Sequence, residues 1–453
     1  MNRTRLVRSA AAVAAALTVL AGCSGGGGSG DSGETTTVNW WTWSPDQAIA
    51  YEQCIPAFEK ANPTIKVKIT NYNVSDYFTK LTSGFVSGDA PDGFMNSVTY
   101  LQSYAGQGQL LPLDDYISKD KLDMGQYAIG ADGWKYKDGK QYALPMDWAT
   151  GALYYNKDLL AKAGYTDKDV AALNWTSDGG GTFWKMVKHL AVDSSGKRGD
   201  QPGFRGDAVK TYGLGNLEST GDPFGQNAWG WLLPNDGINI PDKPQWASVF
   251  NYNDPKVVQS VQLVRTLTND GISPKLNQFT TANSQQLGSG KVAMVVGGTW
   301  EAATYAAVKG AKIGTAPLPA GATTGKRALM TNANGNNIWA GSKHPDQTWK
   351  WVSYQESEAC QTTAAKFNGS LFPSIAASMK ALTDQQAAKG ADFSVFNHYL
   401  TSGELVPCPV YNNGAALTNA MTPQFEAYFT NKADESIFPK MQEQSRTLLA
   451  EGK

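Results

Sequence analysis

The order of apolar and polar positions predicts strands and helices in alternation at the start of the folded chain. Residues 38–43 are aromatic and β-branched, which favours a strand. Ser44 can cap a helix that begins at Pro45, and Gln47 can complete a capping box. Apolar residues then recur at helical spacing until the Asn-Pro pair at 62–63, which we expect to end this helix.

A second strand and a second helix continue the alternation. Residues 65–69 alternate as in a strand, and residues 76–87 follow a helical pattern that ends at Gly-Asp-Ala-Pro-Asp, 88–92. A β-α-β-α order predicts a parallel sheet with helices on both faces. Such sheets bind ligands at the carboxyl ends of their strands. Residues 43–46 and Asn96 would lie there.

Residues 137–160 predict a junction between two structured blocks. A turn at Asp138-Gly139 leads to Pro145, which lacks an N–H and should break any regular ladder. Asp147 and Trp148 follow, and residues 152–160 then read as a buried strand and a helix start. One polar-aromatic pair therefore lies where the two blocks meet.

This segment resembles the extracellular solute-binding proteins of ABC importers, in the branch that includes maltose-binding protein. The matching features are Gly139-Lys140, Pro145 and the Tyr-Asn-Lys-Asp-Leu run at 155–159, which in that family mark the first passage from N-lobe to C-lobe. Further matches are the 88–92 turn, Gly-Gln-Leu-Leu-Pro-Leu at 108–113, and residues 290–300.

The resemblance implies an α/β, two-lobed periplasmic-binding-protein fold. Each lobe would be a mainly parallel sheet flanked by helices, and hinge crossings would join the lobes. The N-lobe would comprise residues 38–150 and 335–372, and the C-lobe residues 151–334 and 373–453.

The amino terminus predicts export and lipid anchoring. Arg3, Arg5 and Arg8 precede an apolar run at 10–20 that is too short to span a bilayer. The run ends in Leu-Ala-Gly-Cys, which resembles a bacterial lipobox with Cys23 as the acylated residue. We therefore expect a signal peptide at 1–22, a flexible Gly/Ser tether at 23–37, and attachment to the outer face of the cell membrane.

Composition excludes several function classes. Without residues 1–22 the 453-residue chain loses three arginines and no acid, so its formal charge changes from −1 to −4. This charge disfavours a nucleic-acid or anionic-membrane partner. The 14 Trp and 19 Tyr suit a sugar site, because they pair flat apolar faces with polar groups.

The chain lacks the motifs of common enzymes. It contains neither His-Glu-x-x-His nor Gly-x-Ser-x-Gly, and residues 321–327 miss the P-loop spacing. The acidic loop from Asp193 to Asp207 lacks the EF-hand pattern, so we expect a solvated loop. We predict no catalytic residue, no cofactor and no metal site.

The expected ligand site combines aromatic and short polar side chains at loop positions. A Trp can cover the apolar face of a sugar while Asp, Glu and Asn bind its hydroxyls. We expect Trp231 to be core, and Trp300 to be the strongest stacking candidate because the family has a sugar-stacking Trp there. Residues 292–296 read as a buried strand, so Trp300 should emerge just past its end. The candidates are Trp43, Ser44, Asp46, Asn96, Asp147, Trp148, Asn227, Trp229, Trp300, Glu301, Asn334, Tyr411 and Asn413.

The predicted function is capture of a sugar, an oligosaccharide, between the lobes of a monomer that delivers it to a membrane permease. Two alternatives stay open. One is a secreted glycosidase that uses paired carboxylates such as Asp147 and Glu301. The other is a binding protein for a non-sugar solute.

The resemblance also implies a disulfide. It places Cys54 and Cys360 in the same lobe, and Cys408 in the other lobe near the cleft. Because a bridge between lobes would restrain their closure, we expect Cys54 to pair with Cys360.

Overall fold

The computed structural model describes residues 35–217, 228–331, 333–367, 369 and 371–451. Residues 35–453 form one compact unit, and the expected signal peptide, Cys23 and most of the tether lie outside the described residues. Two five-stranded sheets organise the described chain.

The first sheet has the strand order β2-β1-β3-β14-β4. Its strands are β1 (Thr36–Thr42), β2 (Ile65–Asn71), β3 (Gly93–Asn96), β4 (Leu144–Pro145) and β14 (Gly335–Ile338). Strand β1 pairs in parallel with β2 and β3, as predicted, whereas β14 is antiparallel to both β3 and β4. Strand β4 ends at Pro145, as predicted, and it lies at the sheet edge, where a missing N–H is tolerated.

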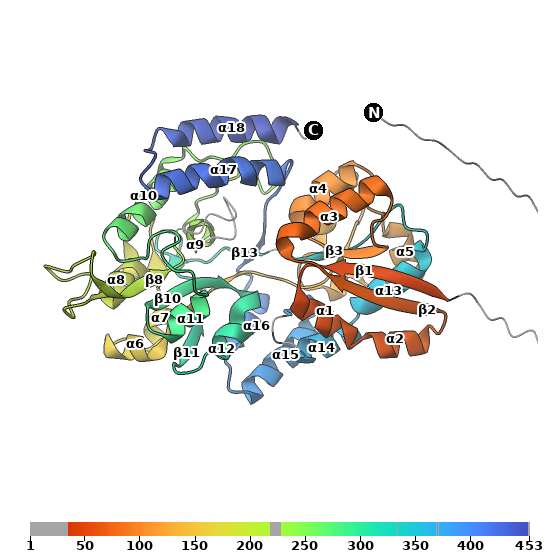
Figure 1. The fold of residues 1–453 in the computed structure, drawn as a ribbon, viewed down its shortest axis with the longest axis horizontal. Coiled ribbons are helices and arrows are strands. Elements are labelled where there is room, and N and C mark those ends of the chain that lie inside the picture. The colour runs from red at the N-terminus through yellow and green to blue at the C-terminus, as the bar shows by residue number, and fades with distance from the viewer. Residues whose placement is uncertain (1–34, 218–227, 332, 368, 370, 452–453) are drawn as a thin grey trace, which may run out of the picture. The chain divides into compact units, whose positions relative to one another are not determined.

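Side chains along β1 point alternately to the two faces of this sheet, and each face has an apolar core. Val38 and Trp40 pack with the helices on one face, while Trp41 contacts the apolar cluster on the other. The first face is covered by α1 (Pro45–Glu52), α2 (Ile55–Ala61), α13 (Pro345–Gln355) and α14 (Glu358–Phe367). The second is covered by α3 (Val74–Ser87) and α4 (Val98–Gly106), which lie together above β1 in Figure 1. The short helix α5 (Asp114–Asp120) follows α4.

The predicted first helix is two helices. Ser44 caps α1 through its hydroxyl, as expected, but α1 ends at Glu52 and α2 begins at Ile55. Pro56 lies at the start of α2, where its missing N–H breaks no helical hydrogen bond. Gln47 does not complete a capping box, because its side chain binds Asp147 instead.

The second sheet has the order β11-β5-β10-β8-β7. Its strands are β5 (Gly151–Asn156), β7 (Val192–Asp193), β8 (Val209–Gly215), β10 (Val292–Gly298) and β11 (Ile313–Ala316). Only β8 and β10 run in parallel within it, so the expectation of a mainly parallel second sheet is wrong. Strand β5 is antiparallel to both of its neighbours. Strands β5 and β10 are buried along their whole length, as predicted.

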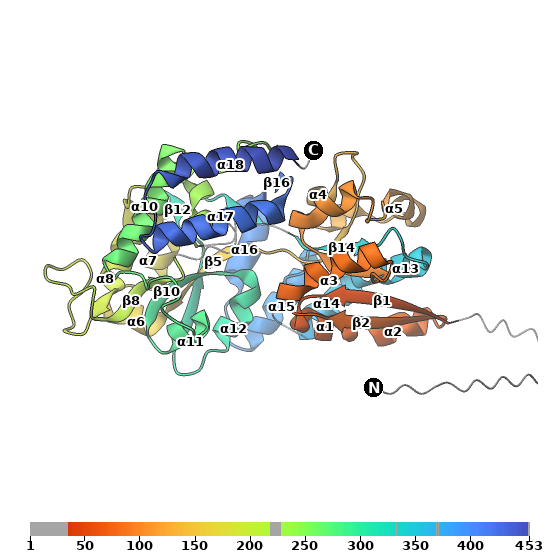
Figure 2. The ribbon, with the colours of Figure 1, turned by 45° about the horizontal axis from the view of Figure 1, so that its top comes forward.

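Helices flank the second sheet and form the rest of the apolar core. They are α6 (Lys157–Lys162), α7 (Asp167–Ala171), α8 (Gly181–Leu190), α9 (Ala228–Leu232), α10 (Pro255–Asn269), α11 (Asn283–Gly288), α12 (Ala302–Ala306), α15 (Ala376–Ala388), α16 (Ser394–Ser402), α17 (Gly414–Phe429) and α18 (Ile437–Glu451). Figure 2 shows α17 and α18 side by side. Asp254 caps α10 through its side chain.

Short elements complete the described chain. Three two-stranded pairs join β6 (Asn174–Trp175) with β12 (Ala320–Gly321), β13 (Leu329–Thr331) with β15 (Leu405–Pro407), and β9 (Gln245–Ala247) with β16 (Val410–Tyr411). The 3-10 turns are Met124–Gln126, Asp132–Trp134, Leu233–Asp236 and Thr299–Glu301.

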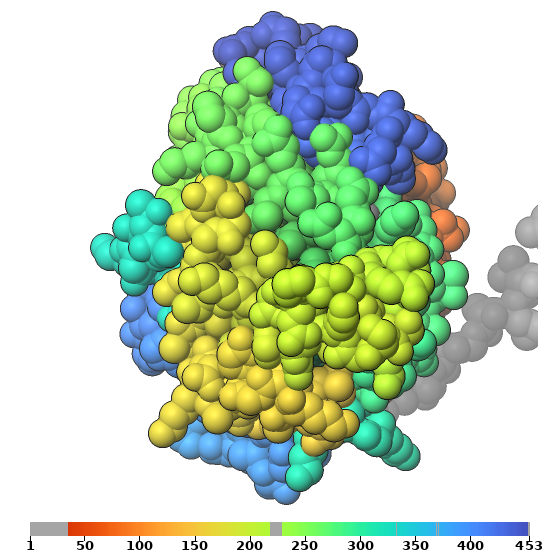
Figure 3. Space-filling view, turned by 90° about the vertical axis from the view of Figure 1, so that its left-hand side faces the viewer, coloured from red at the N-terminus to blue at the C-terminus, as the bar shows by residue number. Residues whose placement is uncertain are grey.

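The acidic loop after β7 is built around one buried carboxylate. It lies on the surface facing the viewer in Figure 3, in yellow-green. Asp193 accepts hydrogen bonds from the backbone N–H groups of Ser195, Lys197 and Arg205. Although burial opposes ionisation, these bonds and one from the Ser195 hydroxyl lower the pKa of Asp193 to about 2. Asp193 therefore organises the loop through hydrogen bonds.

Cys54 and Cys360 form a disulfide with their Cα atoms 5.5 Å apart, which agrees with the expected pairing. The bridge joins the end of α1 to α14 across 306 positions of sequence. Cys408 is half-buried in the segment between β15 and β16.

Removal of this bridge tests its contribution to stability. We expect the double variant Cys54→Ala/Cys360→Ala to lose about 2–4 kcal/mol of unfolding free energy. Without the bridge, the unfolded chain regains the conformational freedom that the closed loop had removed. Urea unfolding measures the loss, and reduction of the wild type should reproduce it. Cys408→Ala is the matched control, and equal losses in both variants would contradict the assignment.

Candidate functional site

Three segments of the described chain lie side by side where the two sheets meet. Residues 146–150 connect β4 of the first sheet to β5 of the second, as the sequence predicts for the first crossing. Met146 N donates to Asn334 O at 2.9 Å, and Trp148 N donates to Phe372 O at 2.9 Å. Segments 333–335 and 371–375 therefore flank the first crossing and hydrogen-bond to it.

Asp147 connects this junction to helix α1. Its carboxylate accepts from Gln47 Nε2 at 2.6 Å, and from the backbone N and side-chain Nδ2 of Asn334 at 3.0 Å each. Burial raises the pKa of Asp147, although these three hydrogen bonds oppose the shift. Asp147, Asn334 and the first turn of α1 thus form one polar cluster.

A second buried network lies beside the same crossings. Gln361 on α14 donates to Met146 O at 3.1 Å and to Glu356 Oε2 at 2.9 Å, and it accepts from Ile375 N at 3.1 Å. Glu356 also accepts from Asn336 Nδ2 at 2.8 Å. Burial raises the pKa of Glu356 well above its ordinary value. Gln361 therefore links the first and third crossings through one side chain.

An aromatic cluster lies at the carboxyl end of β10. Trp300 follows the strand in the turn Thr299–Glu301 and is 42 % exposed, so it emerges past the strand as predicted. Its ring lies 6.1 Å from that of Trp231, centroid to centroid, at an interplanar angle of 61°. Glu301 points back into the structure, where Gly298 N donates to it at 3.1 Å. Burial raises the pKa of Glu301.

The polar and aromatic clusters lie close together along the first crossing. Asp147 belongs to the polar cluster, and the backbone of Gly151 packs against the ring of Trp231 in the aromatic cluster. Four residue steps span at most about 14 Å in a fully extended chain. The polar cluster therefore lies near the part of the aromatic cluster that contains Trp231.

Several of the predicted contact residues are buried in this structure. Trp148 is 1 % exposed and packs edge-on against Phe372. Asn96 lies fully buried at the end of β3, and Trp229 packs on Phe425 of α17. Tyr411 packs on Phe250. Neighbouring helices and crossings that are distant in sequence cover these side chains, so none presents a free face to solvent in this structure. Asp147 is also largely buried.

The remaining candidates stay predictions. Trp43 is half-buried against Tyr77 and Phe78, Ser44 caps α1, and Asp46 is exposed in the first turn of that helix. Asn413 is half-buried, precedes α17 in the left-handed conformation, and donates to Leu448 O at 2.8 Å. Asn227 lies outside the described residues.

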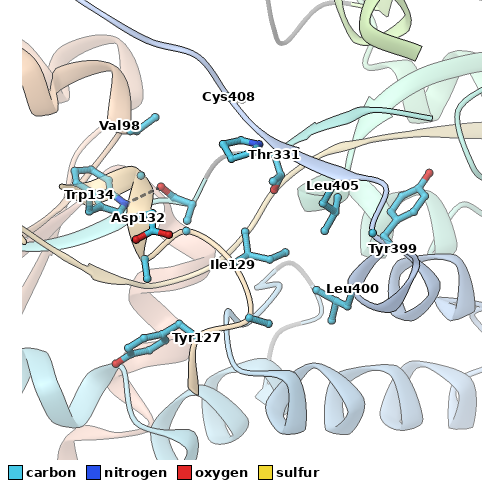
Figure 4. Close-up of a pocket in the computed structure, with 17 residues that line it drawn as sticks. Val98, Tyr127, Ile129, Asp132, Trp134, Thr331, Tyr399, Leu400, Leu405 and Cys408 are labelled. Carbon is cyan, nitrogen blue, oxygen red and sulfur yellow. Dashed lines mark hydrogen bonds between the residues drawn. The ribbon is translucent and has the colours of Figure 1, made fainter. Parts of the chain in front are cut away.

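A separate cavity of about 390 Å³ lies beside the crossings (Figure 4). Val98, Tyr127, Ile129 and Trp134 line it from one side and Tyr399, Leu400, Leu405 and Cys408 from the other. None of the predicted ligand contacts lines it. Its lining combines apolar side chains with a few polar ones, including Asp132 and Thr331. Trp300, the strongest predicted contact, lies on a different surface.

Gln47, Gln361 and Glu356 are parts of the junction that were not predicted from the sequence. Gln47 and Gln361 reach partners 100 and 215 positions away, and no local pattern indicates such contacts. Trp231 was expected to be core, and it is 5 % exposed, but the analysis did not predict its contact with Trp300.

The residues that the structure describes contain no group of three or more His, Cys, Asp or Glu arranged to hold a metal ion. Within the same residues, no helix combines the length and the apolar character needed to cross a membrane.

The buried Asp147 gives a pH test. The folded state holds its proton at pH values where the unfolded carboxyl, with a pKa of about 4, has lost it. The unfolding free energy of the wild type should therefore fall, relative to Asp147→Asn, as pH rises from 4 through the raised folded pKa. Urea unfolding at several pH values measures this difference, with Asp89→Asn on an exposed loop as the control. A wild-type unfolding free energy that instead rises relative to that of Asp147→Asn as pH rises would show that the hydrogen bonds keep the carboxyl ionised.

Comparison with known proteins agrees with the family resemblance. The maltodextrin-binding protein MdxE of Bacillus subtilis (strain 168) is 25 % identical over 311 residues, which cover 67 % of this chain and 65 % of that protein. UspC of M. tuberculosis is 25 % identical with a TM-score of 0.72, covering 92 % of this chain and all of that one. Lmo0181 from Listeria monocytogenes, solved with cycloalternan, is 21 % identical with a TM-score of 0.74, covering 92 % and 99 %.

These similarities establish a two-lobed α/β fold of the periplasmic sugar-binding type. The model of the family "Bacterial extracellular solute-binding protein" matches residues 53–392, which is more than half of the chain. Proteins of this family are substrate-binding proteins rather than enzymes, and they act outside the cytoplasm. This chain therefore belongs to the bacterial extracellular solute-binding proteins.

Proposed function

We propose that this protein is the substrate-binding component of an ABC importer and captures an oligosaccharide between its two lobes. The observation that carries the proposal is Trp300, a large aromatic side chain left 42 % exposed at the end of a buried strand. An exposed Trp face suits the apolar C–H face of a sugar ring.

The surroundings of Trp300 support this ligand class. Asp147 of the polar cluster lies at most about 14 Å from Gly151, which packs against the ring of Trp231 beside Trp300. Asp46 and the half-buried Ser44 in that turn supply groups that can bind hydroxyls. Among the relatives, MdxE is named for maltodextrin, and Lmo0181 was solved with cycloalternan.

The three crossings provide a hinge for capture. A ligand that contacts both lobes stabilises the closed form only by contacts absent from the open form. The permease would then distinguish loaded from empty protein by the closed arrangement. No bond in the sugar is made or broken, and the protein acts as a monomer.

The paired-carboxylate alternative fits the structure less well. Both oxygens of Asp147 are engaged by Gln47 and Asn334, and Glu301 is turned toward Gly298 N. A glycosidase needs one free acid and one free base or nucleophile around the scissile bond.

The amino-terminal sequence supports a lipid anchor on the outer face of the membrane. The Leu-Ala-Gly-Cys sequence and the Gly/Ser-rich stretch after it match a lipoprotein export signal with a flexible tether. The folded unit would then remain close to its permease.

A thermal-shift screen with mono- and oligosaccharides tests the proposal directly. A sugar that binds only the native state stabilises it by RT ln(1 + [sugar]/Kd), so the melting temperature rises as the sugar concentration exceeds Kd. Peptides, polyamines and siderophores in the same screen test the non-sugar alternative. Release of new reducing ends from an oligosaccharide would instead indicate an enzyme.

Trp300→Ala separates a ligand platform from a core residue. As a platform, the change should weaken sugar binding by about 1–3 kcal/mol with little change in the stability of the unliganded protein. As a core residue, it should cost about 3–5 kcal/mol of unfolding free energy. Calorimetric titration and urea unfolding give the two quantities. Retained affinity with a clear stability loss would refute the assignment.

Cys23→Ala tests the anchor. We expect wild-type protein to fractionate with membranes and the variant to carry no lipid, because acylation requires the Cys23 thiol. Intact mass of native material measures the modification. An unmodified residue 23 in wild-type protein would refute the anchor.

A further inference from the structure

The Trp300 ring lies flat on a glycine. A Cβ atom added to Gly298 would lie far inside 3.0 Å of three consecutive carbons at the outer edge of the Trp300 six-membered ring. These carbons, Cζ2, Cη2 and Cζ3, are almost equally distant from that Cβ position, which is possible only above the ring face. Gly298 has φ −82° and ψ 160°, which any residue can adopt. Glycine is therefore required here for space rather than for its backbone conformation.

A second tryptophan lies in the same way on the neighbouring strand. Gly298 on β10 is directly opposite Gly151 on antiparallel β5, so their missing side chains would share one face of the sheet. A Cβ at Gly151 would lie 2.7 and 2.8 Å from Cε3 and Cδ2 of Trp231. The two cross-strand glycines thus leave a flat floor that carries both indole rings.

The two rings support each other at an angle. Trp231 is almost fully buried and contacts Trp300 in an edge arrangement at 61°. Such a pair contributes beyond the buried area, because the positive edge of one ring meets the negative face of the other. Thr299 N donates to Thr150 O at 3.0 Å, which ties the turn that carries Trp300 to the first crossing.

We infer that Gly151, Gly298 and Trp231 are positioning residues that fix the plane of the Trp300 ring for its ligand. The floor holds one face, Trp231 limits rotation of the ring, and the remaining exposed surface receives the flat apolar face of a sugar ring. This inference rests on the proposed function. It assigns the orientation of the ligand ring, and hence discrimination between sugars of different shape, to residues that need not touch the ligand.

Two variants test the positioning. Gly298→Ala places a methyl group where the Trp300 ring lies, and Trp231→Leu removes the ring beside it. We expect each change to weaken sugar binding about tenfold, the equivalent of 1.4 kcal/mol. Trp231→Phe should restore part of the affinity because it keeps an aromatic edge. Gly215→Ala, a tight glycine on β8 of the same sheet, is the matched control and should leave affinity unchanged.

Fluorine NMR of protein labelled with 5-fluorotryptophan reads the position of Trp300 without any ligand. The resonance is assigned by its loss in Trp300→Phe. We expect it to shift in Gly298→Ala and Trp231→Leu but not in Gly215→Ala. An unmoved resonance would overturn the inference, and so would a moved resonance with unchanged affinity. A wild type that binds none of the sugars would overturn the proposed function alone, because the resonance still reports the ring position.

Discussion

The backbone hydrogen bonds that hold three crossing segments side by side are the constraint on which this structure depends. Met146 and Trp148 each donate an N–H to a different neighbouring crossing. Buried polar backbone must be paired, so these segments are fixed laterally to one another. The chain can still change direction where β4 gives way to β5. The hydrogen bonds thus hold the three crossing segments beside one another. A change of backbone direction along the segments would leave these bonds intact, as a hinge requires.

Side chains from outside the crossings reinforce the same junction. Gln361 reaches it from α14, and Gln47 reaches it from α1. The disulfide between Cys54 and Cys360 ties these two helices together next to the first sheet. A bridge within one lobe stabilises that lobe and leaves the movement of the lobes free. The oxidising conditions outside the cytoplasm, where this family acts, permit such a bridge.

The tryptophans serve different purposes although they are chemically the same. Trp40 and Trp148 are covered on all sides and build the core of the first sheet and the junction. Trp231 is buried but contacts the exposed Trp300, so it is part of the apolar core and also borders the candidate site. What separates these cases is the structure next to each ring. A paired glycine floor at the end of two strands leaves an indole ring supported but uncovered.

The sequence by itself determined the elements that depend on local chemistry. The helix cap at Ser44, the buried strand before Trp300 and the passage at 146–150 all follow from patterns within a few residues, and all are found. Only the tertiary structure decided which polar and aromatic residues remain accessible. Trp148 lies in the first crossing and Asn96 ends strand β3, positions that suggest a site, yet both side chains are buried. Exposure and partner choice depend on those long-range contacts, which neither periodicity nor residue type encodes.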